Sequence, residues 1–310
     1  MVTSGQFTAA DDGLHAGSDS FYETETFWFS FFVPERAIGG WLYTSVKSTA
    51  GVCAGGAWIW DASAPEPWRI PFYENFSWLR LGAMPDSPHQ LSFPTGTTIR
   101  VIEPLMSYDL VHDDRDRLRV DLRFEALEPP IPLRSGEPPY PAAHHFDQTG
   151  HVTGTIRLDG ETIDVDCYAM RDRSWGPRPE RGYNRIGYVW AANPAVGFLA
   201  YSLPHSDTDS IHTGYHRVGD VVSYIASGRR SVERDPGSNW VTAMTVHAVD
   251  ELGRDLHAEG RAVSRLVLPG STNICINTSL EWTIDGVVVH GEDQDVWPNK
   301  EFRIRRADGR

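Results

Sequence analysis

The sequence predicts an all-β protein, and three observations support this fold class. Short runs of alternating or continuously apolar residues recur along the chain, beginning with FYETETFWFSFFV at residues 21–33. Gly, Pro or Asp residues separate these runs, which is typical of the strands of sandwiches and barrels. Long apolar runs with a 3.6-residue period are absent, so only short helices are expected.

The expected strands can be followed in order along the chain. In the first half they occupy residues 21–33, 39–48, 51–61, 98–104, 105–113 and 117–127. Residues 150–170 form a predicted β-hairpin around Asp159-Gly160, because Asp-Gly is a strong signal for a two-residue turn. Further strands are expected within 184–193, 196–203, 212–218, 220–226, 239–250, 256–268 and 278–297. The last of these contains a second hairpin turn, Asp285-Gly286.

A proline-rich segment at residues 128–145 marks the predicted domain boundary. It contains six prolines, and proline is excluded from central strands because it cannot donate to the ladder. We therefore expect an N-terminal β-domain at residues 1–135. A C-terminal β-domain at residues 136–310 would then carry the sequence RDRSWGPR, residues 171–178.

Composition and charge exclude several classes of protein. The formal net charge is −14 over 310 residues, which argues against nucleic acid as a partner, because phosphate binding needs a basic surface. Apolar runs stay well short of the roughly 20 residues that span a bilayer. The first 18 residues contain no apolar stretch typical of a secretory signal. A cytoplasmic protein is therefore expected, and its oligomeric state is not indicated.

Cofactor and metal motifs are not apparent. Cys53, Cys167 and Cys275 are widely spaced and predict free thiols rather than a disulfide framework. His212 and His216 share a strand face, but a third ligand at diagnostic spacing is lacking, so neither a metal site nor a cofactor is expected. Glycine-rich phosphate loops and the G-x-S-x-G elbow of hydrolases are also missing.

The run from residue 145 through RDRSWGPR resembles the hydroxyneurosporene synthase-like, or carotenoid 1,2-hydratase-like, family. The match includes Arg171, Asp172, Ser174, Trp175 and Gly176, whereas an arginine stands at position 173 where the family pattern has histidine. The resemblance implies two lipocalin-like antiparallel β-domains packed together. It also implies kinship with hydratases and cyclases, although the substitution at position 173 puts histidine-based chemistry in doubt.

Strand alternation separates the residues of the motif. Arg171 continues the apolar face of the preceding strand, whereas Asp172 continues the opposite face unless a bulge redirects it. One interpretation is structural: Arg171 stacks on Trp175 and closes the end of a barrel. The other is chemical: Asp172 exchanges a proton with a ligand, as a base or an orienting group, because the neighbouring arginines would keep it ionised.

Other residues are weaker candidates. Glu292 and Asp293 follow a strand near the C-terminus and could supply a carboxylic acid, as could His145 at the end of the proline-rich segment. Arg171 and Arg178 could hold polar groups of a substrate or organise Asp172. Aromatic side chains are abundant, and some of them could line a pocket for a large apolar ligand. The predicted substrate-binding residues are Trp175, Arg178, Tyr188, Trp190, Tyr215 and Trp28.

These features lead to two hypotheses about function. The first is a cofactor-independent enzyme that acts on a hydrophobic, isoprenoid-like or polycyclic molecule by hydration or dehydration, isomerisation or cyclisation. Its catalytic residues would be drawn from Asp172, Arg171, Glu292, Asp293 and His145. The second is a carrier or sensor of an apolar ligand, which needs the same pocket without a reactive group. A purely structural module is the third alternative.

Overall fold

The protein is almost entirely β-structure, which confirms the predicted fold class. The computed structural model describes residues 7–15, 17–82, 89–133, 144–178, 185–204, 206–270 and 272–307. Two compact units are present. One contains Thr3–Ile59 and Pro71–Pro179, and the other contains Trp60–Ile70 and Glu180–Arg310, with the first two residues of the chain. Within the described ranges, no helix combines the length and apolarity that a membrane crossing requires.

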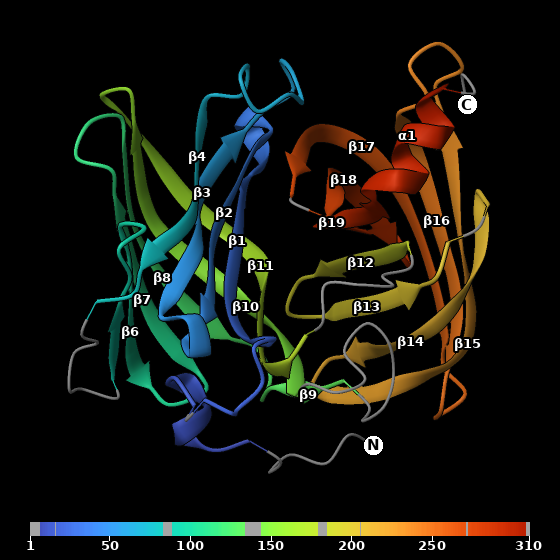
Figure 1. The fold of residues 1–310 in the computed structure, drawn as a ribbon. Helices are drawn as coiled ribbons and strands as arrows, with labels where there is room; N and C mark the ends of the chain where they lie inside the picture. The colour runs from blue at the N-terminus through green and yellow to red at the C-terminus, as the bar shows by residue number, and fades with distance from the viewer. Residues whose placement is uncertain are drawn as a thin grey trace. The chain divides into compact units, whose positions relative to one another are not determined.

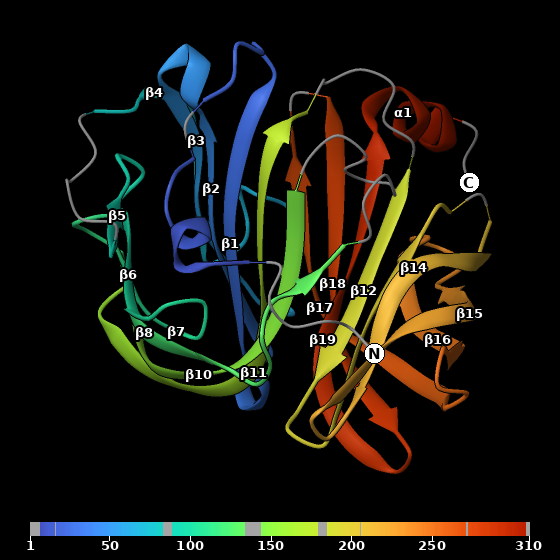
Figure 2. The same ribbon diagram turned by 90° about the horizontal axis from the view of Figure 1, so that it is seen from below.

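The N-terminal unit is built on an eleven-stranded antiparallel sheet that curls around an apolar core (Figures 1 and 2). The spatial order is β4-β3-β2-β1-β11-β10-β8-β7-β6-β5, with β9 paired to β10. Its strands are β1 (Glu23–Val33), β2 (Ile38–Lys47), β3 (Val52–Trp60), β4 (Phe72–Arg80), β5 (Gln90–Ser92), β6 (Thr97–Glu103), β7 (Ser107–Asp113), β8 (Leu118–Ala126), β9 (Ile131–Pro132), β10 (His144–Leu158) and β11 (Glu161–Pro177). Short 3₁₀ turns η1 (Ala9–Asp12), η2 (Pro34–Arg36) and η3 (Ser48–Ala50) precede or follow the first strands.

The C-terminal unit is a closed eight-stranded barrel (Figure 1). Neighbouring strands pair in sequence order, and β12 closes the barrel against β19. The elements are β12 (Ile186–Ala192), β13 (Val196–Ser202), β14 (Thr208–Val218), β15 (Val221–Arg234), β16 (Val241–Asp250), β17 (Asp255–Pro269), β18 (Asn273–Ile284), β19 (Val287–Pro298) and helix α1 (Asn299–Ala307). Alternate residues of each strand fill the interior, where Trp282, Phe198 and Val246 are fully buried.

Both predicted Asp-Gly turns form tight hairpins. Asp159 and Gly160 have φ angles of 49° and 87°, and Asp285 and Gly286 have φ angles of 50° and 80°. Positive φ at both central residues is the requirement of a type I′ turn, which Asp-Gly meets with little strain. The two turns therefore set the register of β10 with β11 and of β18 with β19.

The position of the domain boundary differs from the prediction. The sequence places the boundary at residue 135, but β9, β10 and β11 are all hydrogen-bonded into the first sheet. The two units separate after Pro179 instead, so RDRSWGPR belongs to the N-terminal unit. The proline-rich segment connects two strands of the same sheet, β9 and β10. Residues 134–143 of this segment lie outside the described residues.

Buried arginines occupy the concave, apolar side of the first sheet. Arg171 stacks over the ring of Tyr108 with its guanidinium carbon 4.1 Å from the ring centroid, and Arg173 stacks over Phe27 at 3.8 Å. The expected partner of Trp175 is therefore wrong: Arg173 lies over that indole at 5.3 Å, while Arg171 lies on other rings. Stacking on aromatic faces stabilises guanidinium groups that have lost their hydration.

Carboxylates on the same side of the sheet neutralise these arginines. Arg173 donates a 2.5 Å hydrogen bond from Nη2 to Oε2 of Glu25, and both side chains are 1% exposed. Arg171 donates from Nε to Gln148 at 2.6 Å and lies 3.8 Å from a carboxylate oxygen of Asp12. Removing one member of a buried ion pair leaves the other charge uncompensated, which is strongly destabilising.

The Glu25–Arg173 pair yields a prediction about stability. Glu25→Gln should lower the free energy of unfolding by about 3–5 kcal/mol, because Arg173 would remain buried without a counter-charge. Urea denaturation followed by tryptophan fluorescence measures this change. Glu161→Gln is the matched control: it breaks the exposed Arg36–Glu161 pair and should leave the midpoint almost unchanged. Equal shifts for the two variants would contradict the assignment.

Candidate functional site

The face of the first sheet opposite the arginines carries the candidate site. The register of β11 with β1 and with β10 runs without a shift through the motif, so no bulge redirects Asp172. Asp172 therefore lies on the opposite side of the sheet from Arg171 and Arg173. In this register it stands between Trp28 of β1 and Asp147 of β10. Strict alternation thus places a carboxylate beside an indole and a second carboxylate.

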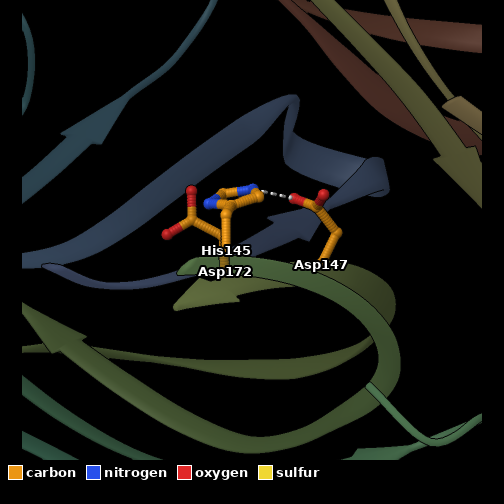
Figure 3. Close-up of side chains that lie close together, drawn as sticks. All are labelled: His145, Asp147 and Asp172. Atoms are coloured by element: carbon orange, nitrogen blue, oxygen red, sulfur yellow. Dashed lines mark hydrogen bonds and ion pairs between the residues drawn. The ribbon is translucent and has the colours of Figure 1, made fainter. Parts of the chain in front are cut away.

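Three side chains come together on this face: His145, Asp147 and Asp172. Figure 3 shows the imidazole of His145 lying between the two carboxylates. Nε2 of His145 is 3.1 Å from Oδ1 of Asp147, a hydrogen bond between side chains that are both almost fully buried. Asp172 is half-buried as a whole, but its Oδ1 atom is fully buried and lacks a hydrogen-bond partner among the described residues.

The environment of Asp172 makes its proton easy to gain and lose near neutral pH. The pKa of this carboxyl is raised from 3.8 to about 6, chiefly because burial removes the hydration of the ionised form, and the negative charge of Asp147 acts in the same direction. His145, Arg178 and Arg173 act in the opposite direction without cancelling the effect of burial. The expectation that nearby arginines dominate is therefore wrong, since alternation directs Arg171 and Arg173 to the other side of the sheet.

A row of aromatic side chains continues from Asp172 across the strands β1 to β4. Trp28 meets Trp41 edge-to-face with ring centroids 5.5 Å apart, and Trp41 meets Trp58 in the same way at 6.3 Å. Tyr43 and Tyr73 flank Trp58 at 6.1 and 6.5 Å. Aromatic faces of this kind bind apolar molecules and stabilise positive charge.

The same three polar side chains meet the distance requirement for a cation. One ligand atom from each of His145, Asp147 and Asp172 can be chosen so that all three lie within 4.8 Å of one another. Nitrogen and carboxylate donors of this kind suit transition metals. The sequence analysis names His145 and Asp172 separately, and the pairing of β10 with β11 adds Asp147 to them.

Candidate residues on the barrel divide between its two faces. Glu292 stands opposite Trp190 in the pairing of β19 with β12, and Leu199 connects Trp190 to Tyr215 in the same row. Tyr188, two residues before Trp190, shares this outer face and meets Tyr201 edge-to-face at 5.0 Å. These predicted residues therefore gather on one buried surface of the barrel.

Asp293 points in the opposite direction from Glu292, into the barrel interior. It accepts two hydrogen bonds from Arg230, at 3.1 and 2.5 Å. The solvated acidic loop that the sequence also allowed at residues 290–297 is replaced by strand β19, most of whose residues here are buried. Asp293 and Glu292 cannot serve one site from the same face.

The remaining predicted residues lie near the site without joining it. Trp175 shares the face of Arg173 and stacks between the rings of His15 and His144, at centroid distances of 4.3 and 5.3 Å. Arg178 follows β11 directly and donates from Nη2 to the hydroxyl of Thr26 at 3.4 Å. Its positive charge acts on Asp172, so Arg178 belongs to the electrostatic surroundings of the site.

Comparisons with known proteins agree with this architecture. A family model for a domain of unknown function, DUF7064, matches residues 8–292. The chain belongs to the DUF7064 family. No curated protein matches the sequence.

Solved structures share the fold of this DUF7064 protein at low sequence identity. A Nitrosomonas europaea protein provisionally assigned as AttH is 14% identical with a TM-score of 0.61, over 95% of this chain and 98% of its own. Kievitone hydratase from Nectria haematococca is 10% identical with a TM-score of 0.58, over 96% and 93%. CghA with Sch210972 is 12% identical with a TM-score of 0.53, over 89% and 88%. These likenesses establish the fold, as the resemblance in the sequence implied.

The raised pKa of Asp172 yields a prediction about stability and pH. The folded protein holds this proton more tightly than the unfolded chain. The stabilising contribution of the protonated carboxyl is therefore lost as pH rises from about 4 to 6, and it is absent above pH 6. Asp172→Asn should therefore stabilise the DUF7064 protein at pH 7, by at most about 3 kcal/mol. Below pH 4 the two proteins should be equally stable.

Thermal melts of both proteins between pH 4 and pH 8 measure this difference. Asp164→Asn on the same strand is the control, because Asp164 is exposed and its replacement should not change the pH dependence. A destabilised Asp172→Asn variant at pH 7 would show that the ionised carboxylate has a stabilising structural role.

Proposed function

We propose that this protein is a cofactor-independent enzyme that transfers a proton to or from a hydrophobic small molecule. The reaction class is hydration or dehydration, isomerisation or cyclisation of an isoprenoid-like or polycyclic substrate. The observation that carries the proposal is the half-buried Asp172 carboxyl with a pKa of about 6, set beside an aromatic row. A carboxyl that titrates near neutral pH is suited to general acid–base catalysis.

In the proposed hydration, the protonated Asp172 gives its proton to one carbon of a double bond. The π electron pair forms the new C–H bond and leaves a carbocation on the adjacent carbon. The face of Trp28, directly opposite Asp172 in the sheet, stabilises that positive charge. Water adds to the cation, and dehydration is the same sequence in reverse. In isomerisation, an adjacent C–H proton leaves instead of water adding.

His145 and Asp147 complete the proton balance. The attacking water must lose a proton, and His145 lies between the two carboxylates where it can accept one. Asp147 orients the imidazole through the 3.1 Å hydrogen bond. The sequence interpretation of Asp172 as a base applies to the reverse direction, in which the ionised carboxylate takes the proton from carbon.

Solved structures give this proposal limited support. One of the proteins that share this fold is a hydratase, and hydration is among the reaction classes that we propose for this protein. Fold alone does not determine chemistry, so the weight rests on Asp172, His145 and Asp147.

Turnover in heavy water tests the proposal directly. A panel of polyenes, prenylated phenols and steroids is incubated with the protein in D₂O, and deuterium incorporated at carbon is measured by mass spectrometry. Asp172→Asn should reduce the rate at least about 100-fold, as expected for loss of a general acid. Asp164→Asn should retain full activity. Tight binding of these compounds without incorporation or any other conversion would favour the carrier or sensor instead.

The pH dependence of the rate tests which form of Asp172 acts. If Asp172 is the acid, kcat/KM for hydration falls about tenfold per pH unit above pH 6, because the protonated fraction falls in the same way. The residual rate of Asp172→Asn should not follow this profile. A rate that increases through pH 6 would assign Asp172 as the base.

Chelation separates acid–base chemistry from metal chemistry at the same three side chains. Prolonged dialysis against EDTA should leave the rate unchanged. Loss of the rate on dialysis and its recovery on adding a transition metal would show that His145, Asp147 and Asp172 act through a cation.

A further inference from the structure

The closed barrel contains a pocket of its own at one end. The pocket has a volume of about 510 Å³, including its open mouth, and lies where β15 ends and β16 begins. Three aromatic residues, Trp240, Trp297 and Phe302, contribute to its walls, and Arg234, Asp293 and Asp295 contribute charged groups. Small-molecule sites likewise combine apolar walls with polar groups that fix the orientation of a ligand.

Ion pairs form a rigid polar layer beside the pocket. Asp295 accepts two hydrogen bonds from Arg185, at 2.7 and 2.6 Å, and Asp293 accepts two from Arg230. Each pair is bidentate, and all four side chains are at least 96% buried. The two carboxylates are therefore neutralised by arginines and have fixed orientations.

Two arginine nitrogen atoms in this layer lack an acceptor within the part of the chain that the structure describes. Nη1 of Arg230 and Nη2 of Arg234 are buried without a hydrogen-bond partner among the described residues. Arg234 donates from Nε to Asp207 at 2.8 Å, but its Nη2 is 3.8 Å from the nearest Asp295 oxygen. Buried donors without acceptors are costly, so an oxygen atom is expected to occupy this position when the pocket is filled.

The aromatic walls are held flat and in place. Arg185 stacks on Trp297 with its guanidinium carbon 3.7 Å from the ring centroid, and Phe302 of α1 meets the same indole edge-on at 6.2 Å. Arg265 lies over Trp240 at 5.5 Å. Rings fixed in this way favour a flat, apolar partner, because stacking gains little from a flexible chain.

We propose that the barrel mouth is a second ligand site, which binds a planar aromatic molecule bearing a neutral oxygen acceptor such as a ketone. The ring system lies against Trp240, Trp297 and Phe302, and the oxygen accepts from Nη2 of Arg234. A neutral acceptor is favoured over a carboxylate because the arginines already have counter-charges: Arg185 and Arg230 pair with Asp295 and Asp293, and Arg234 pairs with Asp207. The site lies within the barrel and does not depend on Asp172, so it goes beyond the proposed activity.

A fluorescent aromatic ketone, prodan, tests this site because its emission shifts to the blue when it leaves water. Titration into the full-length protein should give a saturable blue shift. Arg234→Met should raise the Kd at least about tenfold, because it removes a hydrogen bond from a charged donor. Trp240→Ala should weaken binding to a similar extent and supplies a second variant should Arg234→Met fold poorly.

Matched variants separate this site from the one at Asp172. Trp68→Ala removes an 81% exposed tryptophan and should leave prodan binding unchanged, as should Asp172→Asn and Trp28→Leu. Binding that is lost in Trp28→Leu but retained in both Trp240→Ala and Arg234→Met would overturn the proposal. Failure of the proposed enzyme activity would leave these binding results intact.

Discussion

The antiparallel pairing of β10 with β11 is the constraint on which both sides of the first sheet depend. Arg171 and Arg173 emerge on one side and Asp172 on the other, because successive residues of a strand alternate. On the arginine side, stacked rings and buried carboxylates compensate the charge. On the other side, the same ladder places Asp147 directly opposite Asp172. The same pairing therefore places the compensated arginines on one side of the sheet and brings two carboxylates, Asp147 and Asp172, together on the other.

The acid pair has an energetic cost that the fold does not require. Like charges directly opposite one another destabilise a sheet, and burial adds a penalty for the ionised form. Asn or Thr at position 172 would preserve the strand without either cost. Groups held in unfavourable surroundings concentrate at functional sites, where the perturbed state is used. The contrast with Arg173, whose buried charge is neutralised by Glu25, identifies Asp172 as the unusual residue of the motif.

Much of this site follows from the sequence once the turn is located. A two-residue turn at Asp159-Gly160 pairs residues whose numbers have a constant sum, so Asp147 must stand opposite Asp172 and His145 opposite Ser174. The sequence alone therefore predicts that Asp147 lies beside Asp172. The candidate residues do not include it, because the pairing that the turn imposes was not followed as far as residue 147. The pairing of β11 with β1 was not within reach, since it joins segments about 150 residues apart and leaves no local pattern. The domain boundary was misplaced for that reason.

The same combination of a two-residue turn and strand alternation separates neighbouring acidic residues in the barrel. The Asp285-Gly286 turn fixes β18 against β19, and alternation then separates Glu292 on the outer face from Asp293 inside. Adjacent acids in one motif thus enter different environments: Glu292 lies in a row with Trp190, whereas Asp293 is neutralised by Arg230. In both Asp-Gly hairpins, a short charged motif contains two sets of residues with different roles. A function assigned to such a motif as a whole would combine groups that the sheet keeps on opposite sides.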